Sequence, residues 1–263
     1  MVADEATLPT DLLRSVLGTD AEPSRRVRVG GWDAASEAGR REQNEDAWGH
    51  QYGTFVVADG MGGRPGGAIA ARSAVEASLD VFTRDEVVHP LDWSHRMGLV
   101  NDAVTAAGSR AGHDRVGAAI GIVQCRDDGV VISHVGDVRV YRLRAGVVEL
   151  LTRDHSVVHE IRAAGVDPAE LDATAGRLGA LTSFLGEADT WRQHSLRFVD
   201  RRTDDRFVIC TDGVYRSMRA ADWIALSEIR ECRALADAMV ERARTNSSRD
   251  DRTALVLSLA GPR

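Results

Sequence analysis

Short runs of apolar residues, each bounded by glycine or polar turn residues, predict most of the strands in this chain. Four such runs follow one another directly, at 117–125, 129–137, 138–146 and 147–152. Connections this short join antiparallel neighbours, because a parallel crossover needs a dozen or more residues. The same pattern predicts further strands at 27–34, 53–60, 205–212 and 253–259.

Longer segments with apolar residues at helical spacing predict five helices. They cover 66–85, 91–112, 157–166, 220–228 and 230–245. Runs of strands are therefore segregated from the helices instead of alternating strictly with them. We expect an α+β fold, a four-layer αββα sandwich in which two antiparallel sheets pack together and helix pairs flank them.

The amino terminus has a different composition from the rest of the chain. Residues 1–24 are polar, contain Pro9 and Pro23, and carry one weak amphipathic stretch. We expect this segment to be a flexible tail. Residues 25–263 show no internal repeat and no linker, which predicts a single domain.

Composition and charge exclude several classes of protein. The 263 residues have a net charge of −7 and basic runs no longer than pairs, so a nucleic acid is not the expected partner. No stretch approaches the roughly 18 apolar residues of a membrane span, and the acidic amino terminus has no signal pattern. The three cysteines, at 125, 210 and 232, have no metal-type spacing. We expect a cytoplasmic protein with buried, reduced thiols and no membrane partner.

Acidic residues follow or precede the predicted strands at several points. They are Glu45, Asp46, Asp59, Asp137, Asp212, Asp250 and Asp251. If these strand ends meet at one edge of the sandwich, the carboxylates would repel one another unless cations are bound. Oxygen ligands without histidine or cysteine favour Mg²⁺ or Mn²⁺. Each Asp-Gly pair taken alone is more often a simple turn.

Glycine follows two of these aspartates, and an arginine precedes the first acidic pair. Gly60 would let a backbone carbonyl approach an ion, and Gly213 would leave space beside Asp212. Arg41 lies a few residues before Glu45, and its guanidinium could bind a phosphate group through two hydrogen bonds. Two metal ions beside such an arginine would suit hydrolysis of a phosphate ester by water, without a protein nucleophile.

Six motifs in this order resemble the metal-dependent protein phosphatases of type 2C, in their bacterial form. They are RREQNED, VVADGMGG, ISHVGDVRVY, LTRDHSVV, ICTDGV and SSRDDRTALVL, and the resemblance covers about residues 27–260. It implies the αββα sandwich, a binuclear Mn²⁺ or Mg²⁺ centre at the sheet edges, and hydrolysis of phosphoserine or phosphothreonine in proteins. It further implies a substrate-binding flap at about 156–190.

The resemblance also implies a role for each matching residue. Arg41 resembles the phosphate-binding arginine. Asp59 is similar to the aspartate that bridges both ions, with the carbonyl of Gly60 on one of them. Asp212 and Asp250 look like ligands of the first ion, and Glu45 and Asp46 like residues that hold the second. Asp137 is similar to the aspartate that helps to hold a third, weaker ion.

The sequence departs from the family pattern at several positions. Met61 stands where many eukaryotic members have a histidine proposed as the general acid. His155 lies in a family motif but begins a predicted helix, where packing or capping is the commoner role. Ala118 and Ala119 replace two threonines, and Asp251 replaces the commoner asparagine. The flap is divergent, so it does not indicate which substrates are preferred.

Three hypotheses on function remain at this stage. The first is a phosphatase that reverses serine/threonine kinase signalling, acts on phosphoproteins including such a kinase, and is monomeric by analogy with the family. The second is a catalytically weak or silent module that binds a phosphoprotein or a regulatory partner. The third is a two-metal phosphodiesterase or nuclease, for which the sequence offers no basic groove.

Overall fold

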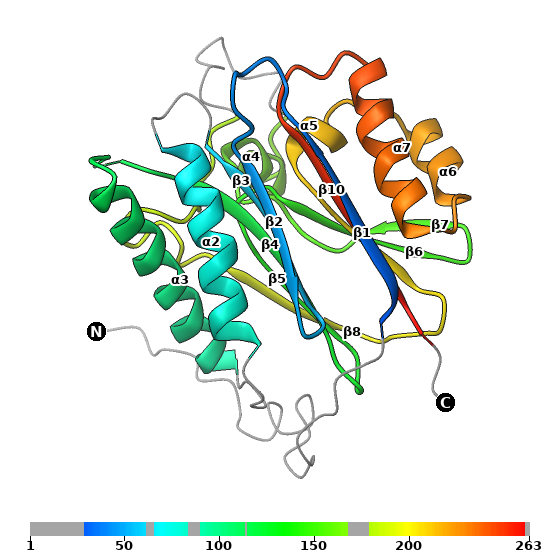
Figure 1. Ribbon diagram of the computed structural model, residues 1–263, viewed down its shortest axis with the longest axis horizontal. Helices are drawn as coiled ribbons and strands as arrows, with labels where there is room; N and C mark the ends of the chain where they lie inside the picture. The colour runs from blue at the N-terminus through cyan, green and yellow to red at the C-terminus, as the bar shows by residue number, and fades with distance from the viewer. Residues whose placement is uncertain (1–28, 62–65, 84–89, 114, 168–178, 261–263) are drawn as a thin grey trace.

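The strands form two antiparallel sheets that pack face to face (Figure 1). The computed structural model describes residues 29–61, 66–83, 90–113, 115–167 and 179–260, so the expected tail at 1–24 lies outside the described residues. One sheet has the order β1 (Val29–Glu37), β10 (Arg252–Leu259), β9 (Arg206–Cys210), β6 (Arg139–Arg144), β7 (Val147–Leu150). The other has the order β2 (Asp46–Gln51), β3 (Thr54–Gly60), β4 (Ala118–Cys125), β5 (Val130–Val135), β8 (Ser195–Val199).

Helices cover the outer face of each sheet. Helices α2 (Gly67–Phe82) and α3 (Pro90–Arg110) lie on the β2–β8 sheet, and α6 (Ala220–Ser227) and α7 (Cys232–Thr245) lie on the β1–β7 sheet (Figure 1). The short helices α4 (Val157–Ala163) and α5 (Asp212–Tyr215) complete the described elements. The predicted α+β sandwich of four layers is confirmed.

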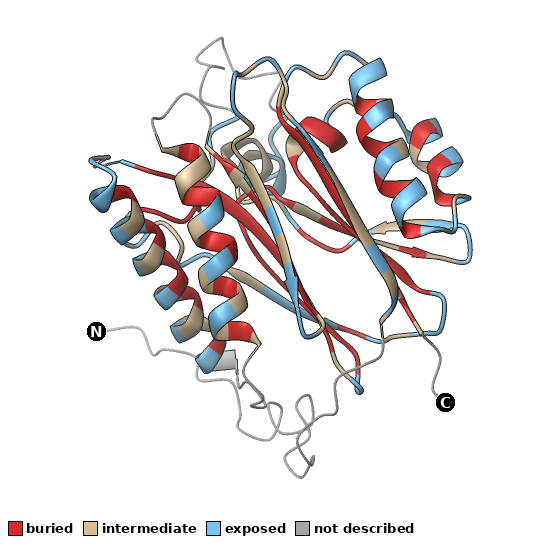
Figure 2. Ribbon diagram, viewed as in Figure 1, coloured by how far each residue is buried: buried red, intermediate tan, exposed pale blue. Residues whose placement is uncertain are grey.

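Three clusters of apolar side chains hold the sandwich together, one between the two sheets and one between each sheet and its helices. Successive residues of the central strands point alternately into two of these clusters. In β3, Val56 and Ala58 face α2 and α3, whereas Phe55 and Val57 face the other sheet. In β9, Phe207 packs between the sheets and Val208 packs under α7. Because both faces of these strands are buried (Figure 2), their sequences are continuous apolar runs, which is why they were predictable.

Two strands and one helix are absent from the sequence-based prediction. Strand β2 reads DAWGHQ and is largely polar or half-buried, and β8 reads SLRFV with three exposed residues at a sheet edge. Such edge strands have no alternating pattern strong enough to indicate them. Helix α5 has only four residues, too few to show helical spacing.

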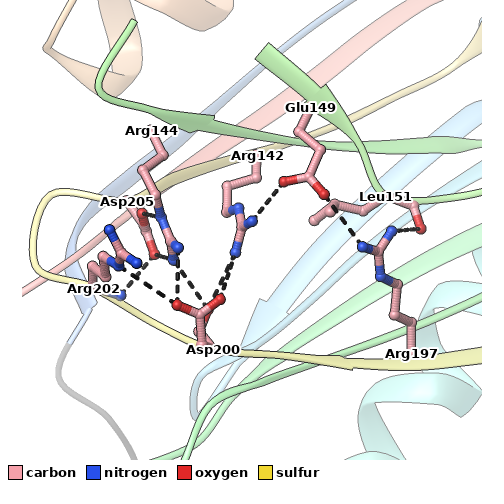
Figure 3. Close-up of polar contacts among 8 residues, drawn as sticks. All are labelled: Arg142, Arg144, Glu149, Leu151, Arg197, Asp200, Arg202 and Asp205. Carbon is pink, nitrogen blue, oxygen red and sulfur yellow. Dashed lines mark hydrogen bonds and ion pairs between the residues drawn. The ribbon is translucent and has the colours of Figure 1, made fainter. Parts of the chain in front are cut away.

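An ion-pair network joins the two sheets at one end of the sandwich (Figure 3). Arg144, in β6, forms two hydrogen bonds of 2.6 Å with the buried carboxylate of Asp205 and also contacts Asp200, which follows β8. In parallel, Glu149 of β7 binds Arg197 of β8 at 3.2 Å. These contacts tie the edge of one sheet to the edge of the other.

None of the helices within the described ranges is both long enough and apolar enough to cross a membrane.

Candidate metal centre

The acidic residues singled out above gather at the end of the sandwich opposite the ion-pair network. Asp59 lies at the carboxyl end of β3 and Asp212 directly follows β9, whereas Asp46 begins β2. Antiparallel pairing places the ends of β3 and β9 beside the starts of β2, β6 and β10. The strand order therefore brings together residues that are more than 200 positions apart, such as Arg41 and Asp251, which meets the condition that the sequence left open.

Two loops meet at this end and are held together by Asp251. The Arg41 loop, residues 38–45, joins β1 to β2, and the Asp251 loop, residues 246–251, joins α7 to β10 (Figure 1). The side chain of Asp251 is only 2 % exposed and accepts hydrogen bonds from the backbone N–H groups of Gly39 and Glu45, at 2.7 and 2.9 Å. A buried carboxylate needs such donors, so Asp251 fixes the path of the Arg41 loop.

Arg41 points into the site and contacts three carboxylates. Its Nη1 atom lies 2.6 Å from Oδ1 of Asp250 and 3.0 Å from Oδ2 of Asp251, and its Nε atom lies 3.4 Å from Oε2 of Glu45. The Arg41 side chain is one-third exposed. A guanidinium in this position has donors directed into the acidic site and an open side toward solvent.

Asp46 and Asp59 form the most electrostatically crowded pair. They are directly opposite each other in the β2–β3 ladder, which places both side chains on the same face of the sheet. Burial, partly offset by hydrogen bonds from Thr253 and Thr211, raises the pKa of Asp46 to about 7. Burial and the neighbouring Asp46 and Asp212 carboxylates raise the pKa of Asp59 well above its ordinary value. The described residues provide Asp59 with no hydrogen-bond donor to offset this.

Asp212 and Asp137 lie beside this pair and share one arginine. Arg216 is 3.0 Å from a carboxylate oxygen of each. Burial raises the pKa of Asp212 to about 6 although Arg216 lowers it, and burial likewise raises the pKa of Asp137. Arg41 and Arg216 thus neutralise part of the acidic cluster, and no arginine or lysine among the described residues pairs with Asp46 or Asp59 at its centre.

The donor set fits divalent cations that prefer oxygen ligands. Oδ1 of Asp46 is buried and accepts no hydrogen bond from the described residues, and the buried Oε2 of Glu45 faces the Nε atom of Arg41 at 3.4 Å without accepting one. A positive ion is the natural partner for such atoms. No group of three or more His, Cys, Asp or Glu side chains in the described ranges is arranged to hold an ion as it stands. Asp250 and Asp212 form ion pairs with Arg41 and Arg216 instead.

Comparison with known proteins gives the family. The sequence model described as protein phosphatase 2C matches residues 35–259, which is most of the chain. This chain belongs to the protein phosphatase 2C family. The serine/threonine phosphatase stp of Listeria innocua serovar 6a is 28% identical over 234 residues, which cover 82% of this chain and 90% of that protein. The protein phosphatase PhpP of Streptococcus pneumoniae is 27% identical over 202 residues, covering 73% and 79% of the two chains.

Solved structures share the fold. The catalytic domain of the serine/threonine protein phosphatase PstP, crystallised in complex with 2 manganese ions, superposes with a TM-score of 0.74 at 21% identity and covers 88% of this chain and 98% of its own. Stp1 from Staphylococcus aureus superposes with a TM-score of 0.76 at 20% identity, covering 92% and 99%. The predictions of a type 2C protein phosphatase and of its sandwich fold are confirmed at the level of the family.

The two glycines next to the site lie where backbone segments cross at close range. In this phosphatase 2C chain a Cβ atom at Gly60 would overlap the carbonyl oxygens of Gly67 and Glu45, and one at Gly213 would overlap the carbonyl oxygen of Asp251. Glycine is therefore required because backbone segments cross in contact. Gly213 allows the start of α5 to lie against the Asp251 loop, which brings Asp212 toward Asp250.

His155 has a packing and positioning role. Its Nδ1 atom accepts a hydrogen bond from the N–H of Gly136 at 3.1 Å, and its ring stacks on His134. Its Nε2 atom lies 2.8 Å from Oγ of Ser195. Burial lowers the pKa of His155 to about 3, so the ring is neutral. These contacts are with Gly136, His134 and Ser195, none of which is a candidate metal ligand. His155 therefore fixes the turn that carries Asp137.

Three residues of the site were not found from the sequence. Thr211 donates a hydrogen bond of 2.9 Å to Asp46 from the strand end before Asp212, and Tyr215 and Arg216 both contact Asp137. The spacing of Arg216, four residues after Asp212, would have indicated an ion pair if α5 had been recognised as a helix.

Proposed function

We propose that this chain hydrolyses phosphoserine and phosphothreonine in proteins at a binuclear Mn²⁺ or Mg²⁺ centre. The observation that carries the proposal is the centre of the acidic cluster, where Asp46 and Asp59 face each other without an arginine partner among the described residues and Oδ1 of Asp46 accepts no hydrogen bond from them. The relatives named as serine/threonine phosphatases, and the PstP catalytic domain crystallised with 2 manganese ions, support the same assignment.

In this proposal the acidic residues would hold two ions. Asp59 and the backbone carbonyl of Gly60 would take part in holding them. Asp212 and Asp250 would hold the first ion, and Glu45 and Asp46 would hold the second. The ions supply Lewis acidity and a lowered pKa for the attacking water. The raised pKa values of Asp46 and Asp59 mean that their ionised forms are destabilised by burial and by neighbouring carboxylates. A bound cation would stabilise these ionised forms.

Arg41 would bind the phosphate group of the substrate, because its guanidinium already points into the site. Met61 carries no proton donor, and its thioether lies against Gly117. In this proposal the leaving serine or threonine oxygen therefore takes its proton from a water molecule or another group of the site, and Met61 has no part in that transfer.

The natural substrates in this proposal are phosphoproteins, a serine/threonine kinase among them, and the working unit is a monomer of one domain. The divergent flap, of which 156–167 and 179–190 lie in the described ranges, is beside the turn of Asp137, because the Leu181 side chain lies against Gly136. Its residues are the ones we expect to contact the polypeptide around the phosphorylated residue.

Release of phosphate from a phosphothreonine peptide tests this function. We expect turnover with Mn²⁺, no turnover with excess chelator, and loss of turnover in Asp212→Asn. Asp237→Asn is the matched control, since Asp237 is an exposed carboxylate on α7, and it should keep full activity. Metal binding without any turnover would favour the silent binding module instead. Salt-sensitive DNA binding with hydrolysis of a phosphodiester would favour the nuclease.

A further inference from the structure

Arg216 spans two carboxylates at the edge of the candidate metal centre. Its Nη1 atom lies 3.0 Å from Oδ2 of Asp212, and its Nη2 atom lies 3.0 Å from Oδ2 of Asp137. Asp212 and Arg216 are one helical turn apart in and just after α5, so their side chains share a face. Asp137 approaches from the turn between β5 and β6, and the guanidinium joins the two elements.

Asp137 is held firmly in this orientation. It is only 7% exposed, and the hydroxyl of Tyr215 donates a hydrogen bond of 3.2 Å to the same oxygen that Arg216 contacts. The Tyr215 ring is itself covered by the guanidinium of Arg139, 3.8 Å from the ring centre, and Asp154 binds that guanidinium through two hydrogen bonds. These contacts leave Asp137 directed toward Arg216.

We propose that Arg216 is a built-in cation that takes the place of a third metal ion at Asp137, so that this chain holds two ions and no third. The inference rests on the binuclear centre of the proposed function. A third ion at Asp137 would have to displace the guanidinium from two ion pairs at once. If the guanidinium stayed, its positive charge would repel an ion so close by.

A tethered cation behaves differently from a dissociable one. Arg216 keeps its charge at every physiological pH and at any ion concentration, because a guanidinium does not lose its proton in this range. It therefore couples the turn of Asp137 to Asp212 permanently. Occupancy of a weak third site would instead depend on the concentration of free Mn²⁺.

Counting bound Mn²⁺ on the full-length chain tests the proposal. Equilibrium dialysis at saturating Mn²⁺ should find two ions per wild-type chain and the same number in Asp137→Asn. The Arg216→Asp variant should bind a third, weaker ion, because carboxylates at 137, 212 and 216 would then face one another without a cation. Adding Asp137→Asn to Arg216→Asp should remove that third ion.

Two control variants test whether the third ion requires a reversed charge at position 216 itself. Arg216→Lys keeps the positive charge and should bind two ions. Arg72→Asp makes the same change of charge on the exposed face of α2, away from the site, and should also bind two.

Three ions in the wild type, falling to two in Asp137→Asn, would overturn the proposal without depending on how any Arg216 variant folds. A folded Arg216→Asp chain that binds only two ions would overturn it as well. A wild-type chain that hydrolyses the phosphothreonine peptide and binds three ions would overturn this inference alone. No bound Mn²⁺ at all would overturn both the inference and the proposed function.

Discussion

Asp251 shows how a residue outside the proposed ligand set organises the site. Its buried carboxylate binds the Arg41 loop through two backbone N–H groups and also contacts the Arg41 guanidinium. The same side chain thus fixes both the backbone that carries Glu45 and the arginine that would bind phosphate. Arg41 accordingly enters the site from a constrained loop instead of from a free surface position.

The first prediction concerns Arg41. We expect Arg41→Lys to raise the KM for a phosphothreonine peptide about tenfold, because an ammonium cannot form the paired hydrogen bonds of a guanidinium and each charged hydrogen bond contributes about 1.5–3 kcal/mol. The kcat should change less. Arg40→Lys, at the exposed neighbouring position, is the control. An unchanged KM would show that Arg41 does not bind the phosphate group.

His155 makes a prediction on pH. Its pKa in the folded chain is about 3, because burial lowers it, whereas the unfolded value is near 6.5. The unfolded state therefore binds the proton first, and the free energy of unfolding should fall as the pH decreases from about 6.5 toward 3. Urea unfolding at several pH values should show a shallower pH dependence in His155→Gln. Equal slopes in the two proteins would contradict this account of His155.

At the scale of elements, the site depends on backbone segments that cross without side chains between them. Helix α5 begins at Asp212 because Gly213 lets the helix start lie against the Asp251 loop. The Asp251 loop in turn positions the start of β10. A change in this crossing would move Asp212 away from Asp250 while leaving the three apolar clusters in place.

We therefore expect Gly213→Ala to remove Mn²⁺ binding and activity from a chain that still folds. The added methyl group would overlap the carbonyl oxygen of Asp251 and push α5 outward. Gly31→Ala in β1 is the matched control, because a Cβ atom there would meet only the Ser258 hydroxyl, at an ordinary contact distance of 3.8 Å. Metal binding and activity can be compared with circular dichroism of the same samples. Full activity in Gly213→Ala would contradict the close packing described here.

The strands that are clearest in the sequence are buried on both faces, whereas those that were missed are partly exposed. Strands β3, β9 and β10 are buried on both faces, so their apolar runs are clear in the sequence, and the acidic residues at their ends could be selected. Strands β2 and β8 are half-exposed, and α5 is a single turn, so their sequences have no comparable period. Arg216 was missed because its meaning depends on α5 and on Asp137, which is 79 residues away.

On the scale of the whole molecule, charge is divided between the two ends of the sandwich. Strands β6 and β9 have Asp137 and Asp212 beside one end and the Arg144–Asp205 pair at the other. At the latter end arginines satisfy the carboxylates and join the sheets (Figure 3). At the former, no arginine among the described residues pairs with Asp46 or Asp59. The fold is thus closed by ion pairs at one end, and the proposed cations would bind at the other.

This division predicts that Arg144 stabilises the fold but does not contribute to catalysis. Arg144→Met would leave Asp205, which is 1% exposed, without its two strongest hydrogen bonds. We expect a loss of about 2–3 kcal/mol in the free energy of unfolding, with activity retained in the folded fraction. Arg192→Met breaks an exposed pair with Asp189 and should cost less than about 1 kcal/mol. Equal losses in urea unfolding would contradict the role assigned to the network.

The most direct test of the account is a calorimetric titration of Mn²⁺ into the wild-type chain and into Asp59→Asn. Asp59 is a carboxylate that would hold the ions in the proposed function, and it has the least compensation from the described residues. We predict clear binding of Mn²⁺ by the wild type and loss of most of that binding in a folded Asp59→Asn chain. Binding of the same number of ions with unchanged affinity in Asp59→Asn would contradict the assignment of the metal centre.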